Sequence, residues 1–442
     1  MNRPGIPQSA TDSAGVDRAE RIMASVDDGF DGQVRFLQDL VRYPSQRGNE
    51  QTAQDFMQAA MQARGLAVDR WQIDVDRIKD HPGFSPVTVD YDNAWNVVGT
   101  HRPAGAATGR SLILNGHIDV VPVGPTDMWR VPPYEPRIEN GWMHGRGAGD
   151  MKAGLTANLF AYDALRRLGL APAATVYFQS VTEEECTGNG ALDCLQKGYR
   201  ADAVLIPEPT KANLVRANVG VLWFQVEVRG RPVHVAEATS GANAILATYK
   251  IIEALKALEA KWNAAKAEHA LFADEDHPIN INVGKIAGGD WASSVPAWCR
   301  IDVRAGIYPG IAVADAKAEI EACIAAAARA DPMLSNMPPA VTYNGFTSEG
   351  YVLAEGSDAE TALAAAHAQS SDSVLEAEIS PAYLDARVFV LYDDTPALVY
   401  GPESDGIHGF DERVNLTSLR QVTKAIALFM ADWCGLEARA AD

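Results

Sequence analysis

Five short segments of the sequence carry imidazole or carboxylate groups, the side chains that hold divalent metal ions and move protons. In chain order they are His117-Ile118-Asp119, Gly147 to Lys152 with Asp150 inside it, Glu183-Glu184-Glu185, Pro207-Glu208-Pro209, and Gly406-Ile407-His408-Gly409. Three carboxylates and two imidazoles make five ligands, which are enough for two divalent ions that share one bridging carboxylate. The segments together therefore predict a site for two metal ions.

Each segment also has an ordinary structural interpretation. An acidic triplet is more often a solvated loop than a metal site, and an isolated histidine such as His408 is usually a surface residue. Asp150 can simply cap the helix that is expected to start at Met151. These interpretations do not explain why all five segments lie at the ends of expected strands or helices, so the metal site is the favoured hypothesis.

Two of the segments predict specific chemical roles. On an extended backbone His117 and Asp119 point to the same face, so Asp119 can hold the imidazole in one tautomer. Consecutive glutamates at a strand end point in different directions, so one can bind a metal while its neighbour faces the attacking water. A carboxylate in that position is the general base that a hydrolase needs.

The elements that position these groups follow from the periodicity of the apolar residues. Amphipathic helices are expected at 31–41, 51–64 and 155–168, and short β-rich runs at 111–115 and 174–181. Strands that alternate with helices predict an α/β fold with a largely parallel sheet flanked by helices. The functional residues of such sheets collect at the carboxyl ends of the strands, and three of the five segments, those with His117, Glu184 and Glu208, follow expected strands.

A second unit is expected to begin near Gly220. Its strands and helices follow in the order β-α-β-β-α-β, which is typical of a ferredoxin-like fold; the strands are expected at 221–228, 279–283, 299–303 and 340–343, and the helices at 243–258 and 313–328. A strand at 397–400 and a helix at 416–433 return to the first unit. The expected division is a catalytic domain in two parts, 1–218 and 339–442, with an inserted domain at 219–338.

Length, charge and cysteine content limit the class of protein. A chain of 442 residues can form two domains with cores of their own, and its formal net charge of −20 argues against nucleic acids and anionic membranes as partners. Five scattered cysteines without a C-x-x-C pair suggest neither a disulfide framework nor a thiolate zinc site. The first residues lack the apolar stretch of a secretory signal, so a cytoplasmic location is expected.

The order and spacing of the motifs resemble the di-metal aminoacylase/carboxypeptidase family, which includes acetylornithine deacetylase, succinyl-diaminopimelate desuccinylase and carboxypeptidase G. The family pattern of His-x-Asp, Gly-Arg-Gly-x-x-Asp-Met-Lys, Glu-Glu, Glu-Pro-Thr and a late histidine is matched at 116–119, 145–152, 184–185, 208–210 and 408. The resemblance extends over the chain from about Phe36 onward. It implies that the inserted domain is a lid that usually forms the interface of a homodimer.

The resemblance also implies roles for the metal-site residues. His117 and Glu208 would hold one ion, Glu185 and His408 the other, and Asp150 would bridge the two. Asp119 would orient His117, and Glu184 would be the general base. The positions of Gly188 and Gly190 match the family spacing and make Glu183 the flanking residue of the triplet. Zinc is the expected metal, with cobalt or manganese as alternatives.

Substrate-binding residues are implied in the same way. His234 resembles the family histidine that crosses the dimer to the partner's active site, and Arg304 resembles the arginine that binds the substrate carboxylate. This chain departs from the family at Ser293, where many relatives have asparagine. It also carries Tyr383-Leu384-Asp385-Ala386-Arg387 in place of the common Gly-Thr-Asp, and a binding role is expected for Asp385 and Arg387, with Leu384 changing the polarity of the pocket.

The resemblance implies a hydrolase that cleaves the amide bond of an N-acyl amino acid or a similar small carboxylate-bearing amide. A metallo-dipeptidase or carboxypeptidase of the same family is the alternative, although family dipeptidases tend to carry aspartate where this chain has Glu208. A binding protein that kept the fold without catalysis is the alternative from another class. It is disfavoured because every inferred ligand and the general base are present.

Overall fold

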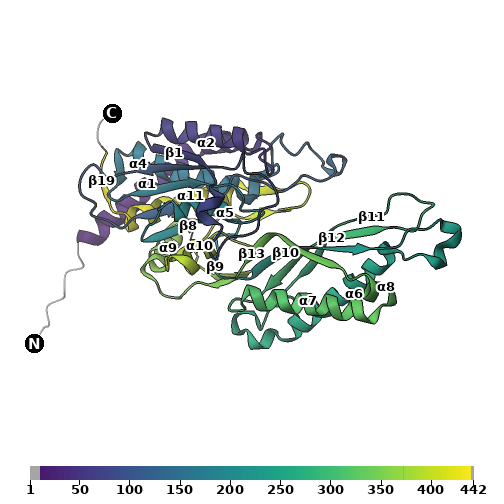
Figure 1. Cartoon of the computed structure of the whole chain (residues 1–442). Helices are drawn as coiled ribbons and strands as arrows, with labels where there is room; N and C mark the ends of the chain where they lie inside the picture. The colour runs from purple at the N-terminus through teal and green to yellow at the C-terminus, as the bar shows by residue number, and fades with distance from the viewer. Residues whose placement is uncertain (1–9, 372, 440–442) are drawn as a thin grey trace, which may run out of the picture.

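The computed structural model describes residues 10–371 and 373–439, which form two bodies of unequal size (Figure 1). The larger body contains both ends of the described chain, and the smaller one projects from it. Each has a hydrophobic core of its own, one built around the central sheet and one between residues Leu222 and Leu334. The chain therefore folds as a mixed α/β protein with an inserted unit.

A six-stranded sheet forms the centre of the larger body. Its strands lie in the order β1 (Ala67–Gln72), β2 (Trp95–His101), β7 (Val176–Ser180), β3 (Leu112–Leu114), β8 (Ala203–Ile206) and β16 (Ala397–Val399). The pairs β7/β3, β3/β8 and β8/β16 are parallel, and only β2 runs against the rest of the sheet. All residues of β3, β8 and β16 are buried, as expected for strands covered on both faces.

Helices cover both faces of this sheet. One layer contains α1 (Ala10–Val41), α2 (Gln51–Ala63), α4 (Ala153–Arg167), α9 (Asp358–Ser370) and α11 (Leu416–Trp433); the other contains α3 (Val75–Ile78), α5 (Asn189–Gln196) and α10 (Ala386–Tyr392). Helix α1 is much longer than the helix expected at 31–41. The buried residues Ile22, Val26 and Phe30 continue its apolar stripe at i+4 spacing and bury the upstream turns.

The smaller body is built on a four-stranded antiparallel sheet in the order β11 (Ile281–Gly288), β12 (Trp298–Ile307), β10 (Gly220–Arg229) and β13 (Ala340–Ser348). Helices α6 (Ala244–Ala264) and α7 (Val313–Ala330) pack on one face of it, with α8 (Pro332–Asn336) beside α7. The predicted boundary at 338 falls before β13. Because β13 pairs with β10 along its length, the inserted sheet runs on to Ser348.

Alternation along β10 and β12 decides which side chains face away from the helices. In β10 the side chains of Leu222, Phe224 and Val226 are buried, while Trp223 and Gln225 between them are partly exposed. This period of two is the pattern of a sheet with one covered face. The open face of the inserted sheet therefore carries Trp223 and the polar residues of β12.

Shorter elements complete the structure. The remaining strands are β4 (Arg137–Glu139), β5 (Trp142–His144), β6 (Leu170–Pro172), β9 (Leu214–Asn218), β14 (Tyr351–Val352), β15 (Ala377–Ser380), β17 (Ser404–Asp405), β18 (Arg413–Asn415) and β19 (Leu436–Ala438). Short helical segments occur at η1 (Thr126–Met128), η2 (Ala148–Lys152), η3 (Val235–Ser240), η4 (Lys266–Glu268) and η5 (Ala270–Phe272). Across the described ranges, no helix has the length and apolar character needed to span a lipid bilayer.

Candidate metal centre

Three neighbouring parallel strands deliver most of the predicted ligands. His117 and Asp119 follow β3, the glutamate triplet follows β7, and Glu208 follows β8. Strand β3 lies between β7 and β8 and is parallel to both. Their carboxyl ends therefore meet at one edge of the sheet, as the sequence predicts.

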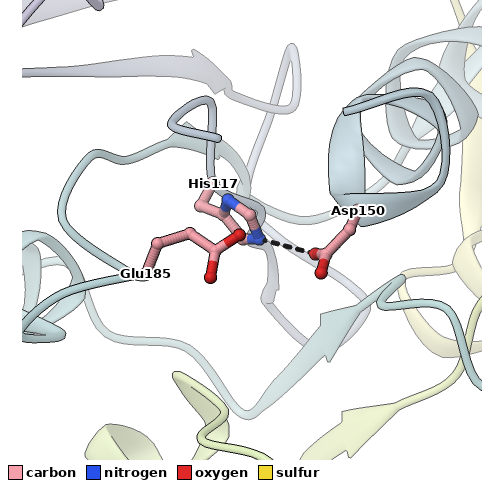
Figure 2. Close-up of side chains that lie close together, drawn as sticks. All are labelled: His117, Asp150 and Glu185. Carbon is pink, nitrogen blue, oxygen red and sulfur yellow. Dashed lines mark hydrogen bonds and ion pairs between the residues drawn. The ribbon is translucent and has the colours of Figure 1, made fainter. Parts of the chain in front are cut away.

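Asp150 and His408 reach the same edge from two other segments. Asp150 lies in η2, directly before α4, and His408 lies in the loop between β17 and β18. Figure 2 shows the carboxylate of Asp150, the imidazole of His117 and the carboxylate of Glu185 turned toward one another. One ligand atom from each of these three residues lies within 4.8 Å of the others.

Asp150 lies between the two histidines. Its Oδ1 is 3.2 Å from Nε2 of His117, and its Oδ2 is 3.3 Å from Nε2 of His408. Glu208 Oε1 lies 3.7 Å from His117 Nε2, whereas Glu185 Oε2 lies 3.1 Å from His408 Nε2. The five side chains thus form two groups that share one carboxylate.

The tautomer of His117 is fixed by the main chain. Its Nδ1 lies 2.9 Å from the carbonyl oxygen of Asp119, while the carboxylate Oδ1 of Asp119 is farther away, at 3.7 Å. A carbonyl can only accept, so Nδ1 carries the proton and Nε2 is free to bind a cation. The carboxylate of Asp119 accepts from the backbone N–H of Glu185 at 3.1 Å, which ties the two loops together.

Glu183 is occupied elsewhere. Its carboxylate accepts two hydrogen bonds from Arg47, at 2.5 and 2.7 Å, and one from the hydroxyl of Tyr91 at 2.7 Å. Glu184 instead lines a cavity beside the cluster, and its carboxylate lies 3.8 Å from Nε2 of His117. These contacts are consistent with the flanking position that the glycine spacing predicts for Glu183.

The electrostatics of the cluster favour a cation. Burial raises the pKa values of Glu184 and Glu208 well above the usual range, and neighbouring carboxylates add to the effect. Burial opposes the charging of His408, but Glu185 and Asp150 outweigh it and raise its pKa to about 11. Within the described residues, Oε1 of Glu208 is buried without a hydrogen-bond partner. A buried set of carboxylates with unsatisfied oxygens is the environment that a divalent ion fits.

A buried ion pair that sequence reasoning missed braces the cluster. Nη1 of Arg146 lies 2.5 Å from Oε2 of Glu412. The other carboxylate oxygen of Glu412 accepts hydrogen bonds from the backbone N–H groups of Gly149 and Asp150, at 2.9 and 3.1 Å. Arg146 also donates to the carbonyl of Gly409, next to His408, at 2.9 Å. The pair therefore positions both the Asp150 turn and the His408 loop. Arg146 belongs to the Gly-Arg-Gly motif, which is the only sequence feature that points to it.

A cavity of about 910 Å³ lies between the cluster and the open face of the inserted sheet. Asp150, Glu184, Glu185, Glu208 and His408 line one side of it. The other side includes Trp223, Asn282, Arg304, Phe346 and Tyr383. The cavity is large enough for a small organic substrate in contact with both bodies.

The predicted substrate-binding residues lie in different places. Arg304 lines the cavity, where its Nη2 donates to the carbonyl of Pro381 at 2.6 Å and burial lowers its pKa to about 10. His234 is exposed on the inserted body and is not among the residues of the cavity. Ser293 lies in the same region and accepts from the N–H of Val235 through its carbonyl at 3.0 Å.

The segment that replaces Gly-Thr-Asp lies partly in the cavity lining and partly outside it. Tyr383 and Leu384 line the cavity, whereas Asp385 and Arg387 are buried outside its lining. Arg387 lies in the first turn of α10, and its Nη2 donates to the carbonyl of Gly83 at 2.9 Å. Arg387 therefore lies outside the cavity lining, and its binding role stays a prediction. Asp385 accepts from the hydroxyl of Tyr383 at 3.0 Å and so positions that ring.

Comparison with known proteins identifies relatives along most of the chain. The model of peptidase family M20/M25/M40 matches residues 113–432. An N-formyl-4-amino-5-aminomethyl-2-methylpyrimidine deformylase of Halalkalibacterium halodurans is 27% identical over 439 residues, covering 94% of this chain and 98% of the relative. A succinyl-diaminopimelate desuccinylase of Caulobacter vibrioides is 26% identical over 406 residues, covering 89% and 93%.

Solved structures share the fold at lower identity. The dipeptidase Dug1p of Saccharomyces cerevisiae superposes with a TM-score of 0.78 at 15% identity, over 94% of this chain and 98% of its own. Human carnosine dipeptidase 1 gives a TM-score of 0.74 at 15% identity, over 94% and 99%. These similarities extend the resemblance to the whole architecture.

Proposed function

Because the chain belongs to peptidase family M20/M25/M40 and is an amide-bond hydrolase, we propose that it removes the acyl group of a small N-acylated amine or amino acid with the help of two divalent ions. The observation that carries the proposal is the position of Asp150, whose two oxygens each face a different histidine. A carboxylate placed in this way can bridge two ions.

The proposed ligands form two sets around this carboxylate. His117 and Glu208 hold one ion, Glu185 and His408 hold the other, and the separation of the two sets by Asp150 supports the assignment. Imidazole and carboxylate donors suit zinc, with cobalt or manganese as alternatives. Two such ions, when bound, lower the pKa of water and polarise the scissile carbonyl.

Glu184 is the proposed general base. It lines the cavity beside His117, and no hydrogen bond from a described residue holds its carboxylate in place, in contrast to Glu183. It would take a proton from the attacking water and return it to the leaving amine. Asp119 supports this arrangement as a positioning residue through its contacts with His117 and Glu185.

The first candidate substrate is an N-acyl amino acid, which carries a carboxylate. Arg304 lines the cavity opposite the cluster, and a guanidinium there can bind a carboxylate with two hydrogen bonds. A second candidate is an N-formylated aminomethyl heterocycle, which is favoured by the deformylase relatives at 27% and 28% identity. Both candidates release an acyl group from an amine.

The inserted domain is proposed to act as a lid and as the interface of a homodimer. We place it at 219–338 with the addition of β13, on the support of its separate core and its ferredoxin-like element order. The parts 1–218 and 339–442, apart from β13, would form the catalytic domain. His234 would then reach the active site of the partner subunit, where it can stabilise the oxyanion.

Metal analysis together with a substrate panel tests this function. The purified chain should bind two equivalents of zinc, and apo-enzyme reconstituted with zinc, cobalt or manganese should hydrolyse N-acyl amino acids or N-formyl arylmethylamines. Control samples treated with a chelator should lose activity and regain it with the metal. A chain that binds fewer than two ions, or that hydrolyses no member of the panel when loaded, would refute the proposal.

A further inference from the structure

Three aromatic side chains form a continuous wall of the cavity that contains Glu184. The rings of Trp223 and Phe346 lie 5.1 Å apart at 87°, and those of Phe346 and Tyr383 lie 4.3 Å apart at 32°. All three residues line the cavity. The substrate therefore meets an aromatic surface as well as the cluster of charged groups.

The rings at the two ends of this wall are held by close contact with glycines. A Cβ atom on Gly345 would lie 2.6 Å from the indole of Trp223, so the absence of a side chain there lets the indole pack flat against β13. A Cβ atom on Gly188, which has φ +71°, would lie 1.8 Å from the hydroxyl oxygen of Tyr383, so glycine is needed there for the tyrosine to occupy its position. That hydroxyl donates to the buried Asp385. A wall fixed in this way is preorganised and loses little freedom on binding.

The wall continues into a row of polar groups across the inserted sheet. Trp223 on β10 is directly opposite Arg304 on β12, which is directly opposite Asn282 on β11. Directly opposed residues of an antiparallel sheet project on the same face, close enough to touch one ligand together. A group bound on Trp223 therefore lies next to a group bound on Arg304.

We propose that the cavity binds a planar aromatic ring carried by the amine half of the substrate, and that Trp223, Phe346 and Tyr383 determine this specificity. The inference rests on the proposed deacylase function and names its substrate class. Aliphatic groups gain from burial alone, whereas a flat ring also gains from stacking and edge contacts with the wall. The ring belongs to the amine half because that half carries the carboxylate of an N-acyl amino acid, and Arg304 adjoins Trp223.

Matched substrate pairs test the proposal with the full chain loaded with zinc. One pair is N-acetyl-L-phenylalanine and N-acetyl-L-leucine, which share a carboxylate; the other is N-formylbenzylamine and N-formylpentylamine, which lack one. We expect kcat/KM for the ring-bearing member to exceed that of its partner about tenfold in the preferred pair. Preference for the first pair identifies an aromatic amino acid, and preference for the second identifies an arylmethylamine.

Removal of a ring from the aromatic wall should reduce the ratio of kcat/KM between the aromatic and the aliphatic substrate. Trp223→Leu and Tyr383→Leu should each lower the aromatic-to-aliphatic ratio several-fold, mainly through KM, while Tyr383→Phe should preserve it because the ring remains. Trp291→Leu is the matched control, because Trp291 is 74% exposed on the inserted body and lies outside the cavity. A wild-type ratio near one in both pairs, or a ratio that neither leucine substitution changes, would overturn ring recognition.

Binding without turnover separates this proposal from the proposed function. Calorimetry on Glu184→Gln loaded with zinc should show tighter binding of N-acetyl-L-phenylalanine than of N-acetyl-L-leucine, or of N-formylbenzylamine than of N-formylpentylamine. If the wild type hydrolyses both members of a pair equally and the variant binds them equally, ring recognition is wrong and deacylation stands. If the wild type hydrolyses no amide, deacylation is wrong, and the binding ratio alone decides ring recognition.

Discussion

The two walls of the cavity carry different kinds of chemistry. At the carboxyl ends of the central strands, His117 and Glu208 are buried and Asp150 is largely so. Nε2 of His117 lies 3.2 Å from the carboxylate of Asp150 and 3.7 Å from that of Glu208. On the inserted sheet, Trp223 and Asn282 keep part of their surface open to the cavity. The first wall, formed by the residues at the strand ends, holds fixed charges and is called the buried wall. The second wall, formed by the exposed face of the inserted sheet, can contact a ligand and is called the open wall.

The two walls can change independently, which explains how one family can act on several substrates. The buried wall depends on close pairings, since each carboxylate that is left without a cation or a donor is costly. The open wall carries partly exposed side chains, and substitutions of exposed residues usually change stability little. Reaction type should therefore follow from the strand ends, and substrate choice from the inserted sheet.

The largest effect should come from the residue shared by both halves of the cluster. Asp150→Ala should abolish measurable turnover and weaken both metal sites together, because the two oxygens of Asp150 face different histidines. His117→Ala and His408→Ala should instead lower the occupancy of different ions first. Mass spectrometry after equal dialysis measures the metal content. Retention of two ions per chain by all three variants would mean that the cluster does not hold metal as proposed.

A smaller but still large effect is expected at the proposed base. Glu184→Gln should reduce kcat by about 10²–10⁴-fold while both ions stay bound, because the proposed role of this residue is to move protons and not to bind a metal. Glu183→Gln is the matched control. It should lower the unfolding temperature by weakening the pair with Arg47, yet leave most turnover in place. If the two variants exchange these phenotypes, the general base is Glu183.

The buried wall was largely predictable from the sequence because its residues come in short motifs at strand ends. His117 and Asp119 are two residues apart, and the triplet follows its strand directly. The brace between Arg146 and Glu412 was not predictable, because 266 residues separate the partners and only the fold brings them together. The aromatic wall was missed for the same reason, since its three rings come from three distant segments.

The bounds of an element were predicted well where its apolar residues form a regular buried stripe. They were predicted poorly where most side chains of a strand are exposed. Helix α11 occupies the predicted 416–433, with a continuous buried stripe and the side chain of Asn415 capping its first turn. Strand β11 was expected at 279–283 but lies at Ile281–Gly288. Most of its side chains are exposed, so the apolar alternation that marks a half-buried strand is absent there.

His234 provides a test of whether a second copy of the chain completes the active site. His234→Ala should lower kcat by about 10²–10³-fold if the imidazole stabilises an oxyanion. Mixing His234→Ala chains with Glu184→Ala chains, under conditions of subunit exchange, should restore activity to about a quarter of wild type, because half of the random pairs carry one intact site of two. A mixture that stays inactive after demonstrated exchange would show that His234 acts within its own chain or has no catalytic part.

The smallest effect is expected at Arg304, because it would contact the substrate away from the reacting bond. Arg304→Ala should raise KM for N-acetyl-L-phenylalanine about tenfold with little change in kcat, since one charge-assisted contact is lost in both the ground state and the transition state. KM for N-formylbenzylamine, which has no carboxylate, should hardly change.

The matched control lies four residues away on the same face of the same strand. Arg300 pairs with Glu227 at 2.8 Å and is not among the cavity residues, so Arg300→Ala should leave both KM values near wild type. Arg304→Lys should recover part of the loss, because it keeps the charge but not the two parallel donors. An equal rise in KM for both substrates would mean that Arg304 shapes the cavity through its bond to Pro381, and that the open wall does not select a carboxylate.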